Sequence, residues 1–460
     1  MSQIKNIKYQ AIPLPSDILS EKMVGNYDSV RKLIAKRLDD PLTPDCIKER
    51  LKLEEKMLFH LEDEFTFTVD EGLKYMQELI PDFTMEELED LMLRGRIDFK
   101  YINGEKKLLD SFRGALVGVY PEIWNRVGGD DRSYAEEDKV IGQLKDGDKF
   151  GAHIHMHETV EIKPEDDVKG QKAHIHMPIT WEGNPRIKNL KLNTEPAYTK
   201  LAAPEAGCHT VYFEAEAKEG ATFVVDYEYD YIDTYRNMYA MDPALCTKTP
   251  AKEIMDEYTK EVWPHIVFTP FIKTLCAEII GEETNPLLKA RKIYDFITTK
   301  CRYRYTENYS AIENVSEWFL INQQGDCGTQ ALAFITLCRC AGVPAMWESG
   351  RTADASGSGM HDWALFYIEG IGWRHADCSY GGASNTRGAE WRRQFYFGNI
   401  DPWRVPCNWE QTAEFDPPRK FQRNDDSDNQ AGEVEFDSRA AKGNEYNRRN
   451  RCVEAVKLEF

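Results

Sequence analysis

The chain has 460 residues, of which 58 are basic and 78 are acidic, and its formal net charge is −20. Hydrophobic residues make up 42% of the sequence and aromatic residues 12%. This composition excludes a disordered or collagen-like chain, and the acidic charge argues against nucleic acid and anionic membranes as partners. At about 100 to 200 residues per domain, the length predicts two to four domains.

The cellular compartment is inferred from apolar runs and cysteines. The first 22 residues lack the continuous apolar segment of a secretion signal, and no apolar run reaches the roughly 18 residues of a membrane span. Eleven cysteines, an odd number without a CxxC pair, fit a reduced compartment better than a disulfide scaffold. We therefore expect a cytoplasmic protein that does not cross a membrane. The sequence leaves its oligomeric state open.

Residues 1–149 are predicted to form a mainly helical accessory region whose role no motif indicates. Apolar residues recur at three- and four-residue spacing in ERLKLEEKMLFHLEDEF and in VDEGLKYMQELI. Between residues 97 and 110 the sequence alternates around Asn103-Gly104, a dipeptide favoured in type I′ turns. We expect a β-hairpin at that place.

Residues 150–250 are predicted to form a β-sandwich-like domain, because polar and apolar residues alternate in segments such as KFGAHIHMHETVEI and ATFVVDYEYDYI. Six of the ten histidines fall here, and five of them lie on two predicted strands, three on one strand face and two on a candidate partner strand: His153, His155, His157, His174 and His176. Imidazoles at alternate strand positions can converge on a metal ion, so these five are weak metal candidates. A solvated strand face is the simpler interpretation, and we expect no metal site.

Residues 251–416 are predicted to form the catalytic domain, and the polar segment 417–460 is predicted to be a C-terminal tail, extended over the surface or partly disordered. In QQGDCGTQALAFITLCRCAGVPA, Gly325 and Asp326 form a turn and cap, so Cys327 is expected at the start of a helix that ends near Gly342. Backbone amides and the helix dipole at that position favour the thiolate and lower the pKa of a cysteine. The position suits a nucleophile.

Two predicted strands supply the groups that cysteine chemistry requires. HDWALFYIEG places His361 at the start of one strand, and GWRHADCSYGG places Asp377 at the end of the next. An imidazole takes the thiol proton and then protonates the leaving group, and a carboxylate holds the tautomer of that imidazole. Cys327, His361 and Asp377 can fill these three roles.

These three blocks resemble the cysteine, histidine and aspartate motifs of the transglutaminase-like superfamily, including the Trp after His-Asp and the Gly-Trp before the aspartate strand. The resemblance covers residues 285–401. It implies an α+β fold with a papain-like core, in which a helix carrying the cysteine packs on an antiparallel sheet. It also implies that Cys327 is the nucleophile, His361 the general base and acid, and Asp377 the orienting carboxylate.

The expected function is hydrolysis of amide bonds in peptides or proteins through a thioester acyl-enzyme. With an amine as acceptor, the same triad would make a protein-glutamine acyltransferase, and a glycoprotein amidase is a third chemistry seen on this fold. The triad does not separate these activities. A non-catalytic binding or scaffold protein is the alternative from another class, because more than half of the chain precedes the nucleophile.

Further candidates surround the triad. One oxyanion donor is the Cys327 backbone amide, and the side-chain candidates for the second are Gln323, Gln324 and Trp318. Candidates for the substrate cleft are Arg351 and Asp354, in the glycine-rich loop 349–360, with Trp363 and Trp373. No calcium-loop pattern occurs, and we expect no cofactor.

Overall fold

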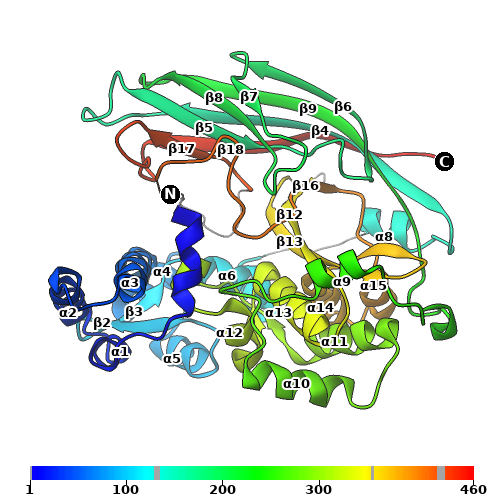
Figure 1. The fold of residues 1–460 in the computed structure, drawn as a ribbon, viewed down its shortest axis with the longest axis horizontal. Coiled ribbons are helices and arrows are strands. Elements are labelled where there is room, and N and C mark those ends of the chain that lie inside the picture. The colour runs from blue at the N-terminus through cyan, green and yellow to red at the C-terminus, as the bar shows by residue number, and fades with distance from the viewer. Residues whose placement is uncertain (1–2, 129–134, 354–356, 422–429) are drawn as a thin grey trace.

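The computed structural model describes residues 3–128, 135–353, 357–421 and 430–460. Figure 1 shows a layered β-sandwich along one side of the molecule and two helix-rich parts on the other. The helix-rich part formed by the first 128 residues lies beside the part that carries α10 to α15. None of the described helices has both the length and the apolar composition that crossing a membrane requires.

The N-terminal part is built from short helices around a three-stranded sheet of order β1-β3-β2. Its hairpin turns at Asn103 and Gly104, whose φ angles of 47° and 88° are both positive, as a type I′ turn requires. The elements are η1 (Gln3–Ala11), α1 (Ser16–Met23), α2 (Tyr27–Asp39), α3 (Asp45–Glu64), β1 (Phe65–Thr68), α4 (Val69–Gln77), α5 (Met85–Leu93), β2 (Phe99–Ile102), β3 (Glu105–Leu109), α6 (Phe112–Val119) and α7 (Pro121–Arg126). Helix α8 (Ala135–Ile141) lies apart from them, beside α15 (Glu390–Phe395), where Arg392 pairs with Glu137 and Asp138.

The β-sandwich consists of two four-stranded sheets with the orders β18-β4-β9-β6 and β17-β5-β8-β7. Alternate residues of β4, such as Ile154 and Met156, are buried between the sheets, so the period-two pattern has its expected cause. The strands are β4 (Lys149–Ile162), β5 (Lys172–Pro178), β6 (Ile187–Glu195), β7 (Lys200–Leu201), β8 (Thr210–Glu216), β9 (Thr222–Thr234), β17 (Glu433–Phe436) and β18 (Tyr446–Lys457).

The C-terminal segment differs from the predicted surface tail. Strand β17 pairs with β5, and β18 pairs with β4 from Tyr446 opposite Ile162 to Lys457 opposite Ala152. Residues 422–429 of this segment lie outside the described part of the chain. The backbone groups of both strands complete a sheet edge, which a polar composition does not prevent. The sandwich is therefore assembled from two distant stretches of sequence.

The catalytic part packs helices on a five-stranded sheet of order β15-β14-β13-β12-β16. Helix α13 is buried along almost its whole length and contacts β13, β12, α12 and α11. The elements are η2 (Pro243–Leu245), α9 (Lys252–Tyr258), α10 (Pro270–Ile280), α11 (Pro286–Lys300), β10 (Arg302–Tyr303), η3 (Tyr309–Ala311), α12 (Val315–Asn322), β11 (Gln324–Gly325), α13 (Cys327–Cys340), β12 (Ala345–Thr352), β13 (Met360–Ile368), β14 (Gly372–Ala376), α14 (Cys378–Thr386), α15 (Glu390–Phe395), β15 (Phe397–Gly398) and β16 (Arg404–Asn408).

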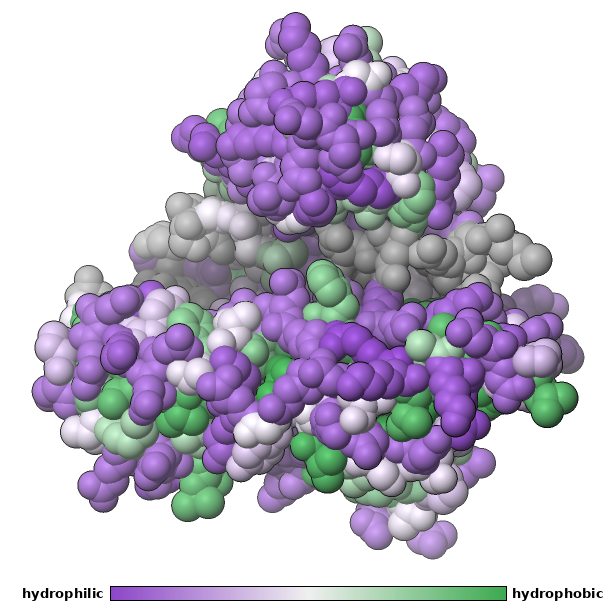
Figure 2. Space-filling view, turned by 90° about the vertical axis from the view of Figure 1, so that its left-hand side faces the viewer, coloured by the Kyte–Doolittle hydropathy of each residue, from purple (hydrophilic) through white to green (hydrophobic). Residues whose placement is uncertain are grey.

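One hydrophobic core runs through the sandwich and the catalytic part, whereas the N-terminal part has two smaller cores of its own. Polar contacts also join the sandwich to the catalytic sheet. Arg186 of the sandwich pairs with Asp233 at 2.7 Å and donates to the Trp373 carbonyl at 3.2 Å. The face drawn in Figure 2 is mainly hydrophilic, with hydrophobic residues scattered over its lower half.

Candidate active site

The start of α13 is fixed by a capping aspartate and by close packing. The side chain of Asp326 accepts a hydrogen bond from the Thr329 backbone N–H at 3.1 Å and others from the hydroxyls of Thr306, at 2.5 Å, and Tyr309. A Cβ at Gly328 would overlap the Tyr309 hydroxyl and would lie 2.7 Å from a carboxylate oxygen of Asp362. Only a glycine allows these groups to approach the turn that carries Cys327.

His361 and Asp377 meet because β13 and β14 are antiparallel neighbours, with Ala364 opposite Ala376. His361 is the second residue of β13 and Asp377 directly follows β14, so both lie at the same end of these two neighbouring strands. The His361 Nε2 and Asp377 Oδ2 atoms are 2.8 Å apart, and both side chains are buried. The geometry suits a carboxylate that fixes an imidazole tautomer.

Asp377 is itself held on several sides. Its Oδ1 accepts from the Tyr380 backbone N–H at 3.0 Å and from the Ser379 hydroxyl at 3.2 Å, and Arg404 Nη2 lies 3.4 Å from Oδ2. Burial alone would raise the pKa of Asp377, but the His361 imidazole and the Arg404 guanidinium hold that pKa below its ordinary value. Asp377 is therefore positioned to remain a carboxylate beside His361.

The sulfur of Cys327 makes a contact that the sequence analysis did not anticipate. Its thiol donates to Asp362 Oδ2, with 3.3 Å between sulfur and oxygen. Burial, and next the negative charges of Asp362 and Asp326, raise the pKa of the Cys327 thiol well above its ordinary value. The prediction of a lowered cysteine pKa is therefore wrong for this state, because burial and two carboxylates outweigh the helix terminus.

The three oxyanion candidates lie around the strand-like turn before α13. Gln323 is exposed and ends α12 in a left-handed conformation with a φ of 52°. Gln324 sits in β11 and its side chain reaches Gly95 of the N-terminal part. Trp318 is half-buried on α12, and the Arg304 guanidinium lies 5.6 Å from its ring. Gln324 and Trp318 thus face the N-terminal part.

The cleft candidates occupy different surroundings. Arg351 is fully buried, pairs with Glu158 of the sandwich and donates to the Tyr227 hydroxyl at 2.7 Å, so its guanidinium is committed to interior contacts. Trp363 is buried and donates to Glu348 at 2.6 Å.

Trp373 is half-buried and packs edge-on against Tyr258 and Tyr367, with ring centroids 4.8 and 5.3 Å away. Asp354 lies outside the described residues.

The five histidines do not gather at one place. His153, His155 and His157 lie on β4, whereas His174 and His176 lie on β5, which belongs to the other sheet of the sandwich. The expected pairing of these strands is therefore wrong.

Each set of histidines has partners of its own. Asp226 bonds to both His155, at 2.9 Å, and His157, at 3.0 Å, and His153 bonds to Asp230 at 2.8 Å. His174 contacts Tyr212, and His176 is buried.

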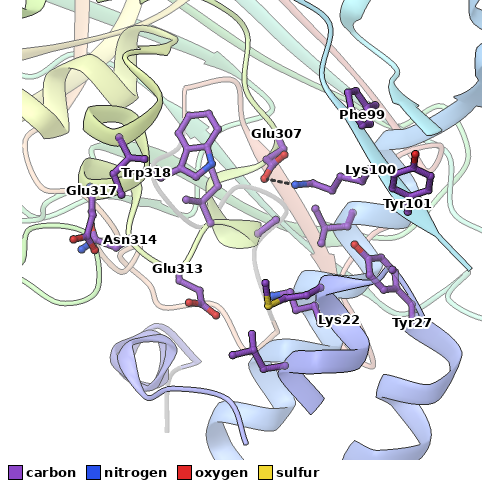
Figure 3. A pocket seen from close by; sticks show the side chains of 17 residues that line it. Lys22, Tyr27, Phe99, Lys100, Tyr101, Glu307, Glu313, Asn314, Glu317 and Trp318 are labelled. Atoms are coloured by element: carbon purple, nitrogen blue, oxygen red, sulfur yellow. Dashed lines mark hydrogen bonds and ion pairs between the residues drawn. The ribbon is translucent and has the colours of Figure 1, made fainter. Parts of the chain in front are cut away.

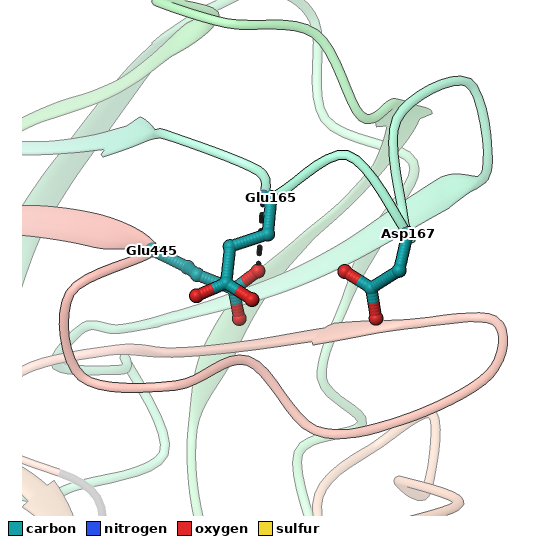
Figure 4. A group of neighbouring side chains, drawn as sticks. All are labelled: Glu165, Asp167 and Glu445. Atoms are coloured by element: carbon teal, nitrogen blue, oxygen red, sulfur yellow. Dashed lines mark hydrogen bonds between the residues drawn. The ribbon is translucent and has the colours of Figure 1, made fainter.

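A group of three carboxylates lies in the connection between β4 and β5 and just before β18: Glu165, Asp167 and Glu445, shown in Figure 4. Within the described residues, this is the only set of three donors already close enough to share a metal ion. Arg439 pairs with Asp167 at 2.9 Å and with Glu445 at 2.6 Å, and Lys442 pairs with Glu165 at 2.5 Å. The carboxylates are thus neutralised by basic side chains.

A cavity of about 620 Å³ lies between the N-terminal part and α12 (Figure 3). Trp318 projects into it, opposite Phe99 and Tyr101 of strand β2. Lys100 and Glu307, which form an ion pair at 3.1 Å, are also part of its lining. The triad residues are not among its lining. This cavity is therefore separate from the start of α13.

Sequence reasoning missed Asp362 and Gln430. Gln430 donates from Nε2 to the His361 carbonyl at 3.0 Å and to Asp362 Oδ1 at 2.6 Å. The one available signal for Asp362 was its position beside His361, but neighbours in a strand normally face opposite sides. No local pattern links Gln430, which lies far along the polar segment, to the nucleophile.

Solved structures that this chain matches include a protein from Cytophaga hutchinsonii described as a candidate cysteine protease, with a TM-score of 0.43 and 15% identity, covering 68% of this chain and 92% of that one. The periplasmic domain of TgpA from Pseudomonas aeruginosa has a TM-score of 0.28 and 13% identity, with coverages of 55% and 94%. Red sea bream transglutaminase has a TM-score of 0.21 and 12% identity, with coverages of 51% and 48%.

Curated relatives match over shorter stretches. An uncharacterized protein of Haemophilus influenzae is 29% identical over 163 residues, covering 29% of this chain and 44% of that protein. The uncharacterized protein YebA of Bacillus subtilis is 22% identical over 120 residues, covering 22% of this chain and 16% of that protein. Both matches span less than half the length of these relatives.

The family model of the transglutaminase-like superfamily matches residues 273–378. This stretch runs from α10 to the first residue of α14 and includes Cys327, His361 and Asp377. The resemblance inferred from the three sequence motifs is thus confirmed by an independent comparison. The chain carries a domain of the transglutaminase-like superfamily.

Proposed function

We propose that the protein is a cysteine-dependent hydrolase that cleaves amide bonds in peptides or proteins through a thioester on Cys327. The observation that carries this proposal is the buried 2.8 Å contact between His361 and Asp377, located where the start of α13 meets β13. A cysteine, an imidazole and an orienting carboxylate are the groups that such a reaction needs. We also propose a cytoplasmic location, on the sequence features alone.

The proposed reaction has two halves. In the first, the sulfur of Cys327 attacks the amide carbonyl while its proton passes to His361, and His361 then protonates the departing amine as the C–N bond breaks. In the second, His361 takes a proton from water, the resulting hydroxide attacks the thioester, and a carboxylic acid leaves as the thiol is restored. Asp377 stabilises the imidazolium formed in each half.

The oxyanion formed in both halves needs preorganised donors. The backbone N–H of Cys327 belongs to the first turn of α13, whose amides have no acceptor within the helix. We assign this amide as one donor.

A non-catalytic binding protein is the second candidate, and one observation favours it. The Cys327 thiol donates to Asp362 at 3.3 Å, and its raised pKa leaves little thiolate at neutral pH. A protein in which Cys327 stays protonated and bonded to Asp362 would not form the thioester.

The test is turnover of peptide and protein amides with and without an added primary amine, combined with mass spectrometry of the intact protein to detect an acyl adduct. We expect product formation and an adduct on Cys327, both lost in Cys327→Ala. The control is Cys340→Ala, because Cys340 is another half-buried cysteine at the opposite end of the same helix. Products joined to the amine would indicate acyl transfer, and no turnover with any amide would favour the binding protein.

A further inference from the structure

Asp362 places a second carboxylate at the nucleophile. His361 and Asp362 are consecutive, yet the His361 side chain contacts Asp377 while the Asp362 side chain contacts the start of α13. Asp362 is 8% exposed, and its Oδ2 lies 3.3 Å from the Cys327 sulfur. The position is thus internal and directed at the reacting atom.

Gln430 fixes the other oxygen of this carboxylate. Its Nε2 donates to Asp362 Oδ1 at 2.6 Å and to the His361 carbonyl at 3.0 Å, so one amide group holds both residues of the His-Asp pair. Its own backbone carbonyl accepts from Arg351 Nη1 at 2.6 Å, and Arg351 is paired with Glu158 of the sandwich. Gln430 is therefore anchored to a buried ion pair.

The surroundings of the sulfur favour the neutral thiol. A carboxylate that accepts the S–H hydrogen bond stabilises the thiol, whereas it repels a thiolate at the same distance. Asp326 adds a second negative charge, and the hydroxyl groups of Tyr303 and Tyr309 are also near the sulfur. The backbone N–H of Asp362 acts in the opposite sense, because it donates towards the sulfur and supports the thiolate.

We propose that Asp362 and Gln430 form a latch that holds Cys327 as a protonated thiol in the resting enzyme, and that substrate entering between the sulfur and Asp362 releases it. The inference rests on the proposed function, in which Cys327 is the nucleophile. Asp362 and Gln430 are positioning residues in this scheme. Once the carboxylate is displaced, the Asp362 amide and the His361 imidazole remain to support the thiolate.

The experiment follows iodoacetamide labelling of Cys327 by peptide mass spectrometry between pH 5 and 10, without substrate. Exposed Cys46 in the same protein serves as an internal reference. Asp362→Asn keeps the shape of the side chain and removes its charge. Gln430→Ala removes the hydrogen bond to Asp362 Oδ1, and Gln10→Ala is its control, because Gln10 is another buried glutamine that donates to a backbone carbonyl, that of Ser310 at 2.8 Å.

A charge this close shifts a titration by about one to three pH units. We therefore expect the labelling midpoint of Cys327 to fall by at least about one unit in Asp362→Asn. A lower midpoint raises the fraction of thiolate at pH 7, but a thiolate of lower pKa is also a weaker nucleophile. Labelling at pH 7 should therefore rise only roughly three- to tenfold. Gln430→Ala should shift the midpoint in the same direction by less, and Gln10→Ala should leave it unchanged.

An unchanged or higher midpoint in Asp362→Asn, with the thermal transition of the wild type, would overturn the latch. If Asp362→Asn does not fold, the labelling midpoints of Gln430→Ala and Gln10→Ala are compared instead. A midpoint in Gln430→Ala that is not below that of Gln10→Ala would then overturn the latch. The two proposals fail separately, because labelling needs no substrate. A shifted midpoint without turnover of any amide would support the latch and refute the hydrolase. Turnover without a shifted midpoint would support the hydrolase and refute the latch.

Discussion

The substitution Asp377→Asn removes one charge from the buried pair with His361 and changes little in shape. In the reaction proposed above, the carboxylate holds the His361 proton on Nε2, which lies 2.8 Å from Asp377 Oδ2, and Nδ1 takes the proton of Cys327. An asparagine can present its NH₂ group to Nε2, and the neutral imidazole then carries its proton on Nδ1. This is the wrong tautomer for a base, so we expect acylation to slow.

The size of the effect follows from burial. In the proposed transition state His361 is an imidazolium, and leaving a buried charge without its partner costs about 3–5 kcal/mol, while about 1.4 kcal/mol corresponds to a factor of ten in rate. We therefore expect kcat/KM to fall roughly 10²- to 10⁴-fold. Stability should fall less, by about 1–3 kcal/mol, because Oδ1 can still accept from Tyr380 and Ser379 and Arg404 keeps Asp401 as a partner.

The assay is steady-state hydrolysis of a peptide amide, with urea unfolding measured on the same samples. Asp233→Asn is the matched control, because the Asp233 side chain is only 9% exposed and its pKa, which burial alone would raise, is also lowered by its partners Arg186 and Arg374. It should lower stability without the tautomer effect on kcat/KM. Activity of Asp377→Asn within about threefold of the wild type would refute the assigned role, since one hydrogen bond to a charged group is worth more than that.

The same variant makes a prediction about pH. Because the pKa of Asp377 in the folded state is below its ordinary value of 3.8, the carboxylate contributes stability above that pH and loses it as the pH falls through the folded-state pKa. Asparagine does not titrate. The difference in unfolding free energy between wild type and Asp377→Asn should therefore be constant above about pH 5 and shrink below pH 3.8. A difference that grows on acidification would contradict this assignment.

Two further substitutions test the packing around the site. Gly328→Ala places a methyl group against a tyrosine hydroxyl and a carboxylate, and should lower stability by about 1–3 kcal/mol and reduce activity, whereas Gly382→Ala, whose methyl group meets nothing nearer than 3.9 Å, should do neither. Arg351→Met leaves the buried Glu158 without its guanidinium partner, so urea unfolding should show a loss of about 3–5 kcal/mol, part of which Glu158→Gln restores in the double variant. A loss below about 1 kcal/mol, the range of surface pairs, would show that Glu158 finds another partner.

The sandwich supports the candidate site through buried polar contacts, which gives it a role beyond that of a separate module. Tyr229 of β9 donates to the Arg404 carbonyl at 2.7 Å, and the Arg404 guanidinium lies 3.4 Å from Asp377. Glu158 of β4 pairs with Arg351, which in turn binds the Gln430 carbonyl. Changes in the sandwich should therefore be transmitted to both carboxylates at the site.

The sequence by itself determined those features whose signals are local. Asp326 followed by an apolar helix predicts the start of α13 at Cys327, because a capping side chain and helical periodicity lie within a few residues of each other. Asn103-Gly104 predicts a hairpin, because few other dipeptides accept two positive φ angles. The order of the cysteine, histidine and aspartate motifs was sufficient to indicate the superfamily.

Only the tertiary structure decided which distant groups meet. Strand β18 pairs with β4 across almost three hundred residues, and its polar sequence carries no mark of its partner, because backbone hydrogen bonds do not depend on side-chain type. Arg351 was expected beside the substrate and is instead buried against Glu158. The raised pKa of Cys327 follows from burial and from the charges of Asp362 and Asp326, and these are properties of the folded interior that no helix terminus reveals.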